Sequence, residues 1–380
     1  MPSGRAWVGE RRYAAAMKTN PIAPQPTGWK IPEIMATVGP TLEKEEDLLL
    51  AIEAGARWFR FPCGYRQRPH LENALAVRAA AQRAGISVQI LLDLPSSRPR
   101  TGSMPELRLA PGAKVLFKEP VEGHPEIPAN GVHLVPLPGL AELLPKMLPH
   151  QRLWFCDGRV RFLIDEVRSD AVLAHLVLGT VPLKSSNSIH LPDSRSPYKT
   201  VTSEDVHLLH SLSEAGLEPD WLALSLIASA EDVVNSRHES ARLLGHKLKI
   251  MAKFETVAAV DHAESIIAAS DGIMVARGDL GMALGYISLP QVQEELVRAA
   301  RRAGRSTVVA TQVLEVFAET GLPQRAELSD LSLIARQRAD AVMLGKETVF
   351  SPRPIECIRF AHEVLAHETR RFENASRKHA

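Results

Sequence analysis

The chain of 380 residues lacks the features by which several classes of protein are recognised. Its three cysteines, Cys63, Cys156 and Cys357, lie far apart and form no C-x-x-C pair, which argues against a zinc site or a disulfide framework. No apolar run approaches the ~18 residues that a membrane helix needs, and the N-terminal region has no continuous apolar stretch of the secretory type. A net charge of +1 gives no reason to expect nucleic acid or an anionic membrane as a partner. We therefore expect a cytoplasmic protein that binds neither.

What the chain does contain is a repeated alternation of short apolar runs and helical patterns. Alternation repeated eight times favours a closed parallel (β/α)8 barrel, a TIM barrel, over an open sheet. An open dinucleotide-binding sheet would need a G-x-G-x-x-G loop after its first strand, where this chain has TVGPT. The expected strands are 33–39, 57–61, 87–93, 221–225, 247–253, 272–276, 306–311 and 340–344, and the expected helices are 43–54, 70–84, 203–215, 229–244, 257–268, 289–303, 327–338 and 354–372.

Residues 101–200 interrupt this alternation with short β-like segments separated by Pro, Gly, Asp and Ser. Because they follow the third expected strand, we predict an inserted all-β domain that acts as a lid. The predicted organisation is a flexible N-terminal arm (1–30), a first part of the barrel (31–100), the inserted β lid domain (101–200), a second part of the barrel (201–373) and a tail (374–380).

Polar residues recur at the carboxyl ends of the expected strands, which in a TIM barrel form the catalytic rim. Glu255 and Asp279 carry hard oxygen ligands, suited to Mg²⁺ or Mn²⁺. Lys253 and Arg60 are fixed cations that could neutralise a phosphoryl group during its transfer. Thr311 offers a hydroxyl to a substrate. The other candidates at this rim are Asp93, Ser225, Ala276, Arg277, Gly278 and Glu347.

Each of these residues also has a purely structural interpretation. A lone Lys or Glu at the end of a strand is more often part of a surface ion pair than of a site. Asp93 could cap a turn, and Ser225 could bond to the backbone. Glu347 could begin a helix, where a negative charge is favoured, and Arg277 could serve in an ion pair instead of contacting a ligand. The functional interpretation therefore rests on the whole set of residues.

Several segments resemble the pyruvate kinase family. The segment ASDGIMVARGDLG (269–281) is similar to the long signature of that family. MAKFET (251–256) resembles its lysine and metal-ligand strand, and VVATQVLE (308–315) resembles its threonine strand. With the shorter matches IMATVGP, PQRAELSDLS, VMLGKET, CDGRV and SIHLP, the resemblance extends over about residues 30–372.

The resemblance implies a phosphotransferase that moves a phosphoryl group between phosphoenolpyruvate and ADP, giving pyruvate and ATP, with Mg²⁺ or Mn²⁺ as its cofactor. By the same resemblance, Glu255 and Asp279 would bind the metal. Lys253 would stabilise the phosphoryl group in transfer, Arg60 would touch the phosphate, and Thr311 would position the enolpyruvate. The substrate-binding residues implied in this way are Arg60, Ser225, Ala276, Arg277, Gly278, Asp279 and Thr311.

The chain departs from the family's pattern on the nucleotide side. After Arg60 it reads FPCGYR where the family has an Asn-x-Ser-His-Gly run, and after Asp93 it reads LPSSRPR where the family has Thr-Lys-Gly-Pro-Glu-Ile-Arg. Two usual side-chain ligands of K⁺ are thereby missing. Arg98 replaces an acidic residue at a position where some members carry Lys and work without K⁺, so we expect no K⁺ requirement. Arg98 and Arg100 are added to the candidate site residues.

These departures leave a second function open, a metal-dependent lyase or aldolase of the phosphoenolpyruvate/pyruvate-binding barrel superfamily that acts through a pyruvate enolate. Barrels can exchange chemistries through changes in their loops, so the fold alone does not decide. The altered nucleotide side favours the lyase, whereas Lys253 favours phosphoryl transfer. A third hypothesis is a non-catalytic binding protein. It is disfavoured because such a protein would have no chemical need to retain a set of Lys, Glu and Asp.

The family's regulatory C-terminal domain has no counterpart in this chain, so the tetramer contacts made by that domain are not expected. The resemblance implies a monomer or a homodimer formed through the barrel, in which Arg325 and Glu327 would belong to the segment facing the neighbouring subunit.

Overall fold

The structure, a computed structural model, consists of two compact units. The first comprises the residues up to Leu94 together with those from Ser203 onward, and the second comprises Pro95–Thr202. The N-terminal arm predicted for 1–30 lies outside the described residues except for its last three. The residues described are 28–65, 69–120, 131–156, 158–191, 198–245 and 247–378.

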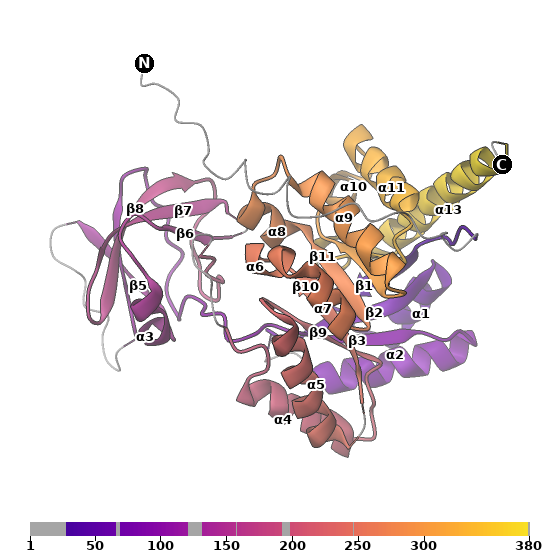
Figure 1. Ribbon diagram of the computed structural model, residues 1–380, viewed down its shortest axis with the longest axis horizontal. Coiled ribbons are helices and arrows are strands. Elements are labelled where there is room, and N and C mark those ends of the chain that lie inside the picture. The colour runs from indigo at the N-terminus through magenta and orange to yellow at the C-terminus, as the bar shows by residue number, and fades with distance from the viewer. Residues whose placement is uncertain are drawn as a thin grey trace. The chain divides into compact units, whose positions relative to one another are not determined.

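Eight parallel strands close into a barrel in the first unit, which confirms the predicted TIM barrel (Figure 1). Each strand pairs in parallel with both of its neighbours, and the last strand in the order pairs with the first, which closes the barrel. Around the barrel the order is β1 (Glu33–Thr37), β13 (Ala341–Leu344), β12 (Ser306–Ala310), β11 (Gly272–Ala276), β10 (Lys249–Phe254), β9 (Trp221–Leu224), β3 (Gln89–Leu94) and β2 (Ala56–Pro62).

The helices predicted from periodicity are present and lie outside the strands (Figure 1). Residues 257–268, expected as one helix, form two that meet at His262. Helices commonly end in glycine with a left-handed backbone, as Gly85 and Gly245 do here with φ of 65° and 72°. The helices are α1 (Glu45–Glu53), α2 (His70–Ala84), α4 (Ser203–Glu214), α5 (Ala230–Leu244), α6 (Val257–Asp261), α7 (Ala263–Ala269), α9 (Leu289–Arg302), α11 (Arg325–Gln337) and α13 (Pro354–Lys378).

Three short helices of the first unit were not predicted, and all three follow barrel strands at the rim. They are α8 (Arg277–Leu284), α10 (Glu315–Thr320) and α12 (Lys346–Val349), which follow β11, β12 and β13 respectively. Segments of four to eight residues are too short to show the helical period clearly in the sequence. Their presence matters because they set the backbone at three neighbouring strand ends.

Helix α13 extends to Lys378, so most of the segment predicted as a tail, 374–380, is helical. The sequence after residue 367 contains Ala, Glu, Arg and Lys, which favour helix, and has neither Gly nor Pro to end it. An ion pair between Glu368 and Arg371, three residues apart, supports the same turn. Among the described residues, no helix is both long and apolar enough to cross a membrane.

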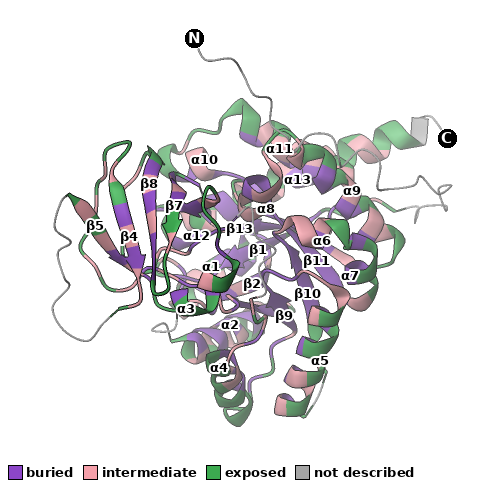
Figure 2. Ribbon diagram, turned by 60° about the vertical axis from the view of Figure 1, so that its left-hand side comes forward, coloured by how far each residue is buried: buried purple, intermediate pink, exposed green. Residues whose placement is uncertain are grey.

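Large side chains from all eight strands fill the interior of the barrel. The rings of Trp58 and Trp221 lie 5.3 Å apart, and their indole nitrogens donate to Glu33 and Gln89. The strands are accordingly buried along almost their whole length, as Figure 2 shows in purple. The interior cluster consists of Met35, Trp58, Leu91, Trp221, Ala223, Met251, Met274, Val308, Ala310, Ala341 and Met343.

The second unit is built on one five-stranded sheet with its own core. The strand order is β5 (Val132–Pro136), β4 (Lys114–Lys118), β8 (Ala171–Gly179), β7 (Val160–Val167) and β6 (Arg152–Phe155), and only the β4–β5 pair is parallel. Phe117 stacks on Phe155 at 5.5 Å and meets Phe162 edge-on at 5.3 Å. The sheet agrees with the predicted β domain, and one short helix, α3 (Leu140–Leu143), adds its two leucines to this core.

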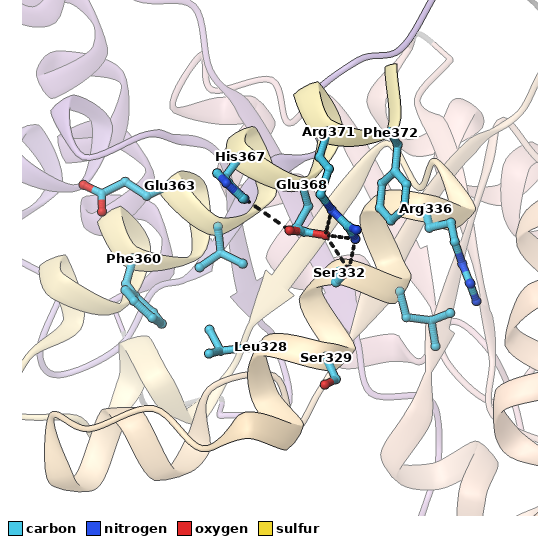
Figure 3. A pocket seen from close by; sticks show the side chains of 12 residues that line it. Leu328, Ser329, Ser332, Arg336, Phe360, Glu363, His367, Glu368, Arg371 and Phe372 are labelled. Atoms are coloured by element: carbon cyan, nitrogen blue, oxygen red, sulfur yellow. Dashed lines mark hydrogen bonds and ion pairs between the residues drawn. The ribbon is translucent and has the colours of Figure 1, made fainter. Parts of the chain in front are cut away.

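Helices α11 and α13 lie side by side on the first unit and leave a surface groove of about 940 Å³ between them (Figure 3). Glu368 crosses this groove, accepting a hydrogen bond from Ser332 of α11 at 2.6 Å while pairing with Arg371 of its own helix. The described residues that line the groove do not include the candidates at the rim.

Candidate active site

Four neighbouring strands of the barrel, β2, β3, β9 and β10, bring a cluster of charged and polar side chains together at the rim. Arg60 lies on β2, Asp93 on β3 and Lys253 on β10. Ser225 directly follows β9, and Glu255 directly follows β10. Two of the hydrogen-bonded partners, Asp93 and Lys253, are 160 residues apart in the sequence. The cluster therefore depends on closure of the barrel.

Lys253 is the centre of this cluster. Its Nζ lies 2.9 Å from Asp93 Oδ1, 2.8 Å from Ser225 Oγ and 3.0 Å from Glu255 Oε1. The contacts with Asp93 and Ser225 are hydrogen bonds, and the contact with Glu255 is an ion pair. The Lys253 side chain is only 9% exposed. A lysine held this way is fixed in position and orientation before any ligand arrives.

Asp93 bridges the two cations of the cluster. Its Oδ1 accepts from Lys253, and its Oδ2 accepts from Arg60 Nε at 2.6 Å. Arg60 also donates to Thr37 Oγ1 at 3.3 Å. Asp93 is buried, whereas the Arg60 side chain keeps 19% of its surface exposed. The contacts exclude the interpretation of Asp93 as a simple turn cap.

The electrostatics keep both central groups charged. Burial alone would raise the pKa of Asp93, but the charges and hydrogen bonds of Lys253 and Arg60 outweigh it and hold the pKa below its usual value. Burial would likewise lower the pKa of Lys253, but Asp93 and Glu255 more than offset burial and raise it. Lys253 is therefore an ammonium ion across the physiological range.

Glu255 serves two neighbours at once. Its Oε1 pairs with Lys253, and its Oε2 accepts from the backbone N–H of Leu226 at 2.8 Å. Leu226 has φ of 57°, a left-handed conformation that branched side chains rarely adopt. Ser225, the residue before it, donates to Leu94 O at 2.6 Å. Glu255 thus holds the turn after β9 in place.

The second part of the rim is formed by β11 and β12. Helix α8 begins at Arg277 directly after β11, with Ala276 as its N-cap. The N–H of Gly278 donates to Thr311 Oγ1 at 2.9 Å, which joins the ends of the two strands. Asp279 lies in the first turn of α8 and is half-buried. Free N–H groups in the first turn of a helix favour an anion.

Arg277 and Glu347 make contacts within the protein that favour their structural interpretation. The Arg277 guanidinium pairs with Asp330 of α11 at 2.6 Å and donates to backbone carbonyls near Thr311. Glu347 is buried in the first turn of α12, and its Oε1 accepts from the N–H groups of Val313 and Leu314. Both residues lie at the rim, as predicted, but as braces of the loop after β12.

Arg98 and Arg100 belong to the second unit and not to the barrel. Arg98 is half-buried. Arg100 donates to Ser186 O at 3.1 Å and forms a β-bridge with Ser188.

Two residues of the site were missed in the sequence. Thr37 ends the first strand and contacts Arg60, although no candidate was assigned to that strand. A hydroxyl at the end of a strand was the available signal. Asp330 pairs with Arg277 from the middle of α11, and only its place in the family-like segment PQRAELSDLS could have suggested it.

A divalent cation fits the donor set at this rim. Among the described residues, no three His, Cys, Asp or Glu side chains come together as a metal cluster. Mg²⁺, however, is commonly held by one or two carboxylates and completes its shell with water and substrate oxygens. Glu255 and Asp279 follow adjacent strands, and each carboxylate oxygen has lone pairs beyond the one a hydrogen bond uses.

Comparison with known proteins gives a consistent answer. The model of the pyruvate kinase barrel domain matches residues 29–358. A pyruvate kinase of Agrobacterium vitis is 32% identical over 336 residues, which cover 88% of this chain and 68% of that protein. Pyruvate kinases of Methylorubrum extorquens and Mycobacterium tuberculosis are 32% and 29% identical, over 86% and 88% of this chain and 66% and 69% of theirs. The chain spans about two thirds of the length of these relatives.

The geometry of the cluster predicts how stability responds to the loss of Asp93. Replacing Asp93 by Asn removes a partner from two cations, and breaking a buried pair costs about 3–5 kcal/mol in the free energy of unfolding at neutral pH. Because the folded pKa of Asp93 is lowered, this stability is present above its unfolded pKa and is lost as pH falls through the folded value. The difference between wild type and variant should therefore close on acidification.

Urea unfolding of both proteins, from neutral to strongly acidic pH, measures this difference. A matched control is Glu45→Gln, which breaks an exposed pair with Arg83 and should leave the unfolding free energy nearly unchanged. A gap between wild type and Asp93→Asn that stays constant down to acid pH would contradict the assignment.

Proposed function

This chain belongs to the pyruvate kinase family, and we propose that it catalyses Mg²⁺-dependent phosphoryl transfer between phosphoenolpyruvate and ADP, giving pyruvate and ATP. The observation that carries the proposal is the buried Lys253 ammonium, held by three acceptors at the rim. Phosphoryl transfer needs fixed positive charge and positioning more than covalent chemistry from the protein. A cation that is already oriented and already charged meets that need.

The other residues of the rim have matching roles. Arg60, partly exposed and anchored by Asp93, would contact the phosphate. The first turn of α8, which contains Gly278 and follows Ala276, would bind the carboxylate of the substrate. Glu255 and Asp279 would hold the divalent cation, which supplies charge neutralisation to the phosphoryl oxygens when bound. Ser225 would act through Lys253, because its hydroxyl oxygen accepts a hydrogen bond from the Lys253 ammonium.

Thr311 would take part in the proton step. Its Oγ1 accepts a hydrogen bond from the N–H of Gly278, and the hydroxyl can still donate its own proton to another acceptor. That proton can be shared with an enolpyruvate bound beside it. In the direction of pyruvate formation, a proton must reach the enolate carbon, and a positioned hydroxyl is a suitable relay.

The metal-dependent lyase remains the alternative that an experiment must separate. A lyase acting through a pyruvate enolate would use the same cation and the same carboxylate site. It has no step in which a phosphoryl group crosses the position of the Lys253 ammonium. The buried lysine is therefore the feature that favours the phosphotransferase, and ATP formation is the measurement that distinguishes the two.

We also propose that the protein is cytoplasmic and acts as a monomer or as a homodimer through the barrel. Of the two residues in the segment suggested for such contact, Arg325 is exposed. Glu327 is largely committed within its own chain, because its carboxylate accepts from the N–H groups of Val316 and Gln324. A dimer contact in this segment would therefore rely on Arg325.

The first test is the reaction itself. With phosphoenolpyruvate, ADP and Mg²⁺, the protein should form pyruvate and ATP in equal amounts. Lys253→Met should lower kcat by about 10²–10³-fold, the loss typical when one preorganised group that stabilises the transition state is removed. The matched control is Lys249→Met on the same strand, since Lys249 is exposed and packs over Trp221 near the start of the strand. Absence of ATP, together with metal-dependent oxalate binding, would favour the lyase.

The metal assignment is tested by binding of oxalate, which resembles the enolate of pyruvate. Glu255→Gln and Asp279→Asn should each weaken Mg²⁺-dependent oxalate binding by about 10²-fold. Loss of a direct ligand should cost at least as much as loss of a residue that only hydrogen-bonds to a ligand. Asp279→Asn leaves all three acceptors of Lys253 in place, so its effect is separable from damage to the cluster. The exposed Glu264→Gln on α7 serves as the control. Unchanged affinity in both variants would refute the assignment.

We further propose that no monovalent cation is required, as the sequence predicts from Arg98 in place of the family's acidic residue. The rate of ATP formation should be the same when K⁺ replaces an organic cation at constant ionic strength, which keeps screening unchanged. Strong activation by K⁺ would overturn this proposal. Arg98→Gln should lower the rate measured without K⁺.

A further inference from the structure

The loop that carries Thr311 has a strained backbone. Thr311 and Gln312 have φ of 73° and 53°, so two consecutive residues other than glycine lie in the left-handed region. For a β-branched residue such as threonine this conformation is a genuine outlier. Strain of this kind persists only where the surroundings hold it, and it is concentrated at functional sites. The contacts around this turn must therefore be strong enough to hold both residues in the left-handed conformation.

On one side, the carbonyl groups of the turn are held by Arg277. Its Nη2 donates to Thr311 O at 2.6 Å and to Gln312 O at 3.0 Å, and its Nε donates to Thr311 O at 3.1 Å. The guanidinium is oriented from behind by Asp330 of α11, 2.6 Å from its Nη1. Arg277 is buried, with 8% of its side chain exposed. The planar guanidinium provides several donors in a rigid arrangement.

On the other side, the N–H groups that follow the turn are held by Glu347. Its Oε1 accepts from Val313 N at 3.1 Å and from Leu314 N at 3.0 Å, while its Oε2 accepts from Gly345 N at 2.8 Å. Glu347 has a relative exposure of only 1%. A buried carboxylate with three N–H partners is well satisfied and fixed in place.

We propose that Arg277, Asp330 and Glu347 form a clamp whose function is to position Thr311 for the reaction. The clamp holds the turn so that Thr311 Oγ1 stays 2.9 Å from Gly278 N. Arg277 and Glu347 are positioning residues in this account and touch no substrate. The inference rests on the proposed function, because it assigns the clamp to the step in which Thr311 acts.

Asp330→Asn is the most informative variant, because Asp330 contacts only the guanidinium of Arg277 within the clamp. Loss of an outer partner of this kind typically costs 10–100-fold, so kcat should fall by about that factor while KM for ADP changes little. The matched control is Asp271→Asn, which breaks another partly buried Arg–Asp pair, with Arg237 at 2.8 Å, before β11 begins. This control should lose comparable stability and keep the kcat of the wild type.

A second variant tests strain directly. Arg277→Lys should lower kcat at least as much as Asp330→Asn, because it removes the rigid donors. Adding Gln312→Asn to Arg277→Lys should restore part of kcat, since asparagine adopts the left-handed backbone more readily than glutamine. A residue that merely stabilised the fold would not be rescued by a change of backbone preference at position 312.

Amide hydrogen exchange separates failure of the clamp from failure of the proposed function. The N–H groups of Val313 and Leu314 should exchange faster in Asp330→Asn and Arg277→Lys than in wild type or Asp271→Asn, with no substrate present. If wild type makes no ATP, this exchange still tests the clamp. If wild type makes ATP but Asp330→Asn keeps both kcat and exchange rates unchanged, the clamp is refuted.

Discussion

The rim of this barrel depends on one buried ammonium group. Removing a charge from water is expensive, and the cost is recovered only where partners satisfy every donor. Lys253 has three partners, and they come from β3, the end of β9 and the residues after β10. If any of these strands were displaced by one residue, side chains would exchange the inner and outer faces and an acceptor would be lost. The lysine therefore ties the register of the barrel to its chemistry.

The charges in the cluster alternate in sign from one partner to the next. Arg60 is positive, Asp93 negative, Lys253 positive and Glu255 negative, so the four groups are neutral as a set. A neutral set is less costly to bury than an excess of either sign. In the proposed reaction, a phosphorylated substrate and a divalent cation would bring opposite charges. A neutral cluster would receive both with little change in net charge, and each would find an oppositely charged partner.

The sequence was sufficient for the barrel because its strands are buried on both faces. Continuous apolar runs such as GIMVA (272–276) report that burial directly, and their ends mark the rim. The sequence was not sufficient to predict which side chains the rim residues contact. Asp93 and Lys253 are 160 residues apart, and nothing in either segment indicates that the two meet. Short helices such as α12 also escaped, since four residues carry too little periodicity.

The acids of the rim illustrate why a position at a strand end does not by itself define a role. Glu347 and Glu255 follow β13 and β10, and only the family resemblance, not their place at a strand end, singled out Glu255 as the metal ligand. In the structure, Glu347 accepts three backbone N–H groups, whereas Glu255 accepts one and shares its other oxygen with Lys253. Three backbone donors make Glu347 a brace, because a metal would have to compete with hydrogen bonds that hold a strained turn. Glu255 has one backbone donor on Oε2 and the Lys253 ammonium on Oε1, so each of its oxygens keeps a lone pair that a cation could use. The difference between a brace and a candidate ligand is therefore set by the donors around each acid.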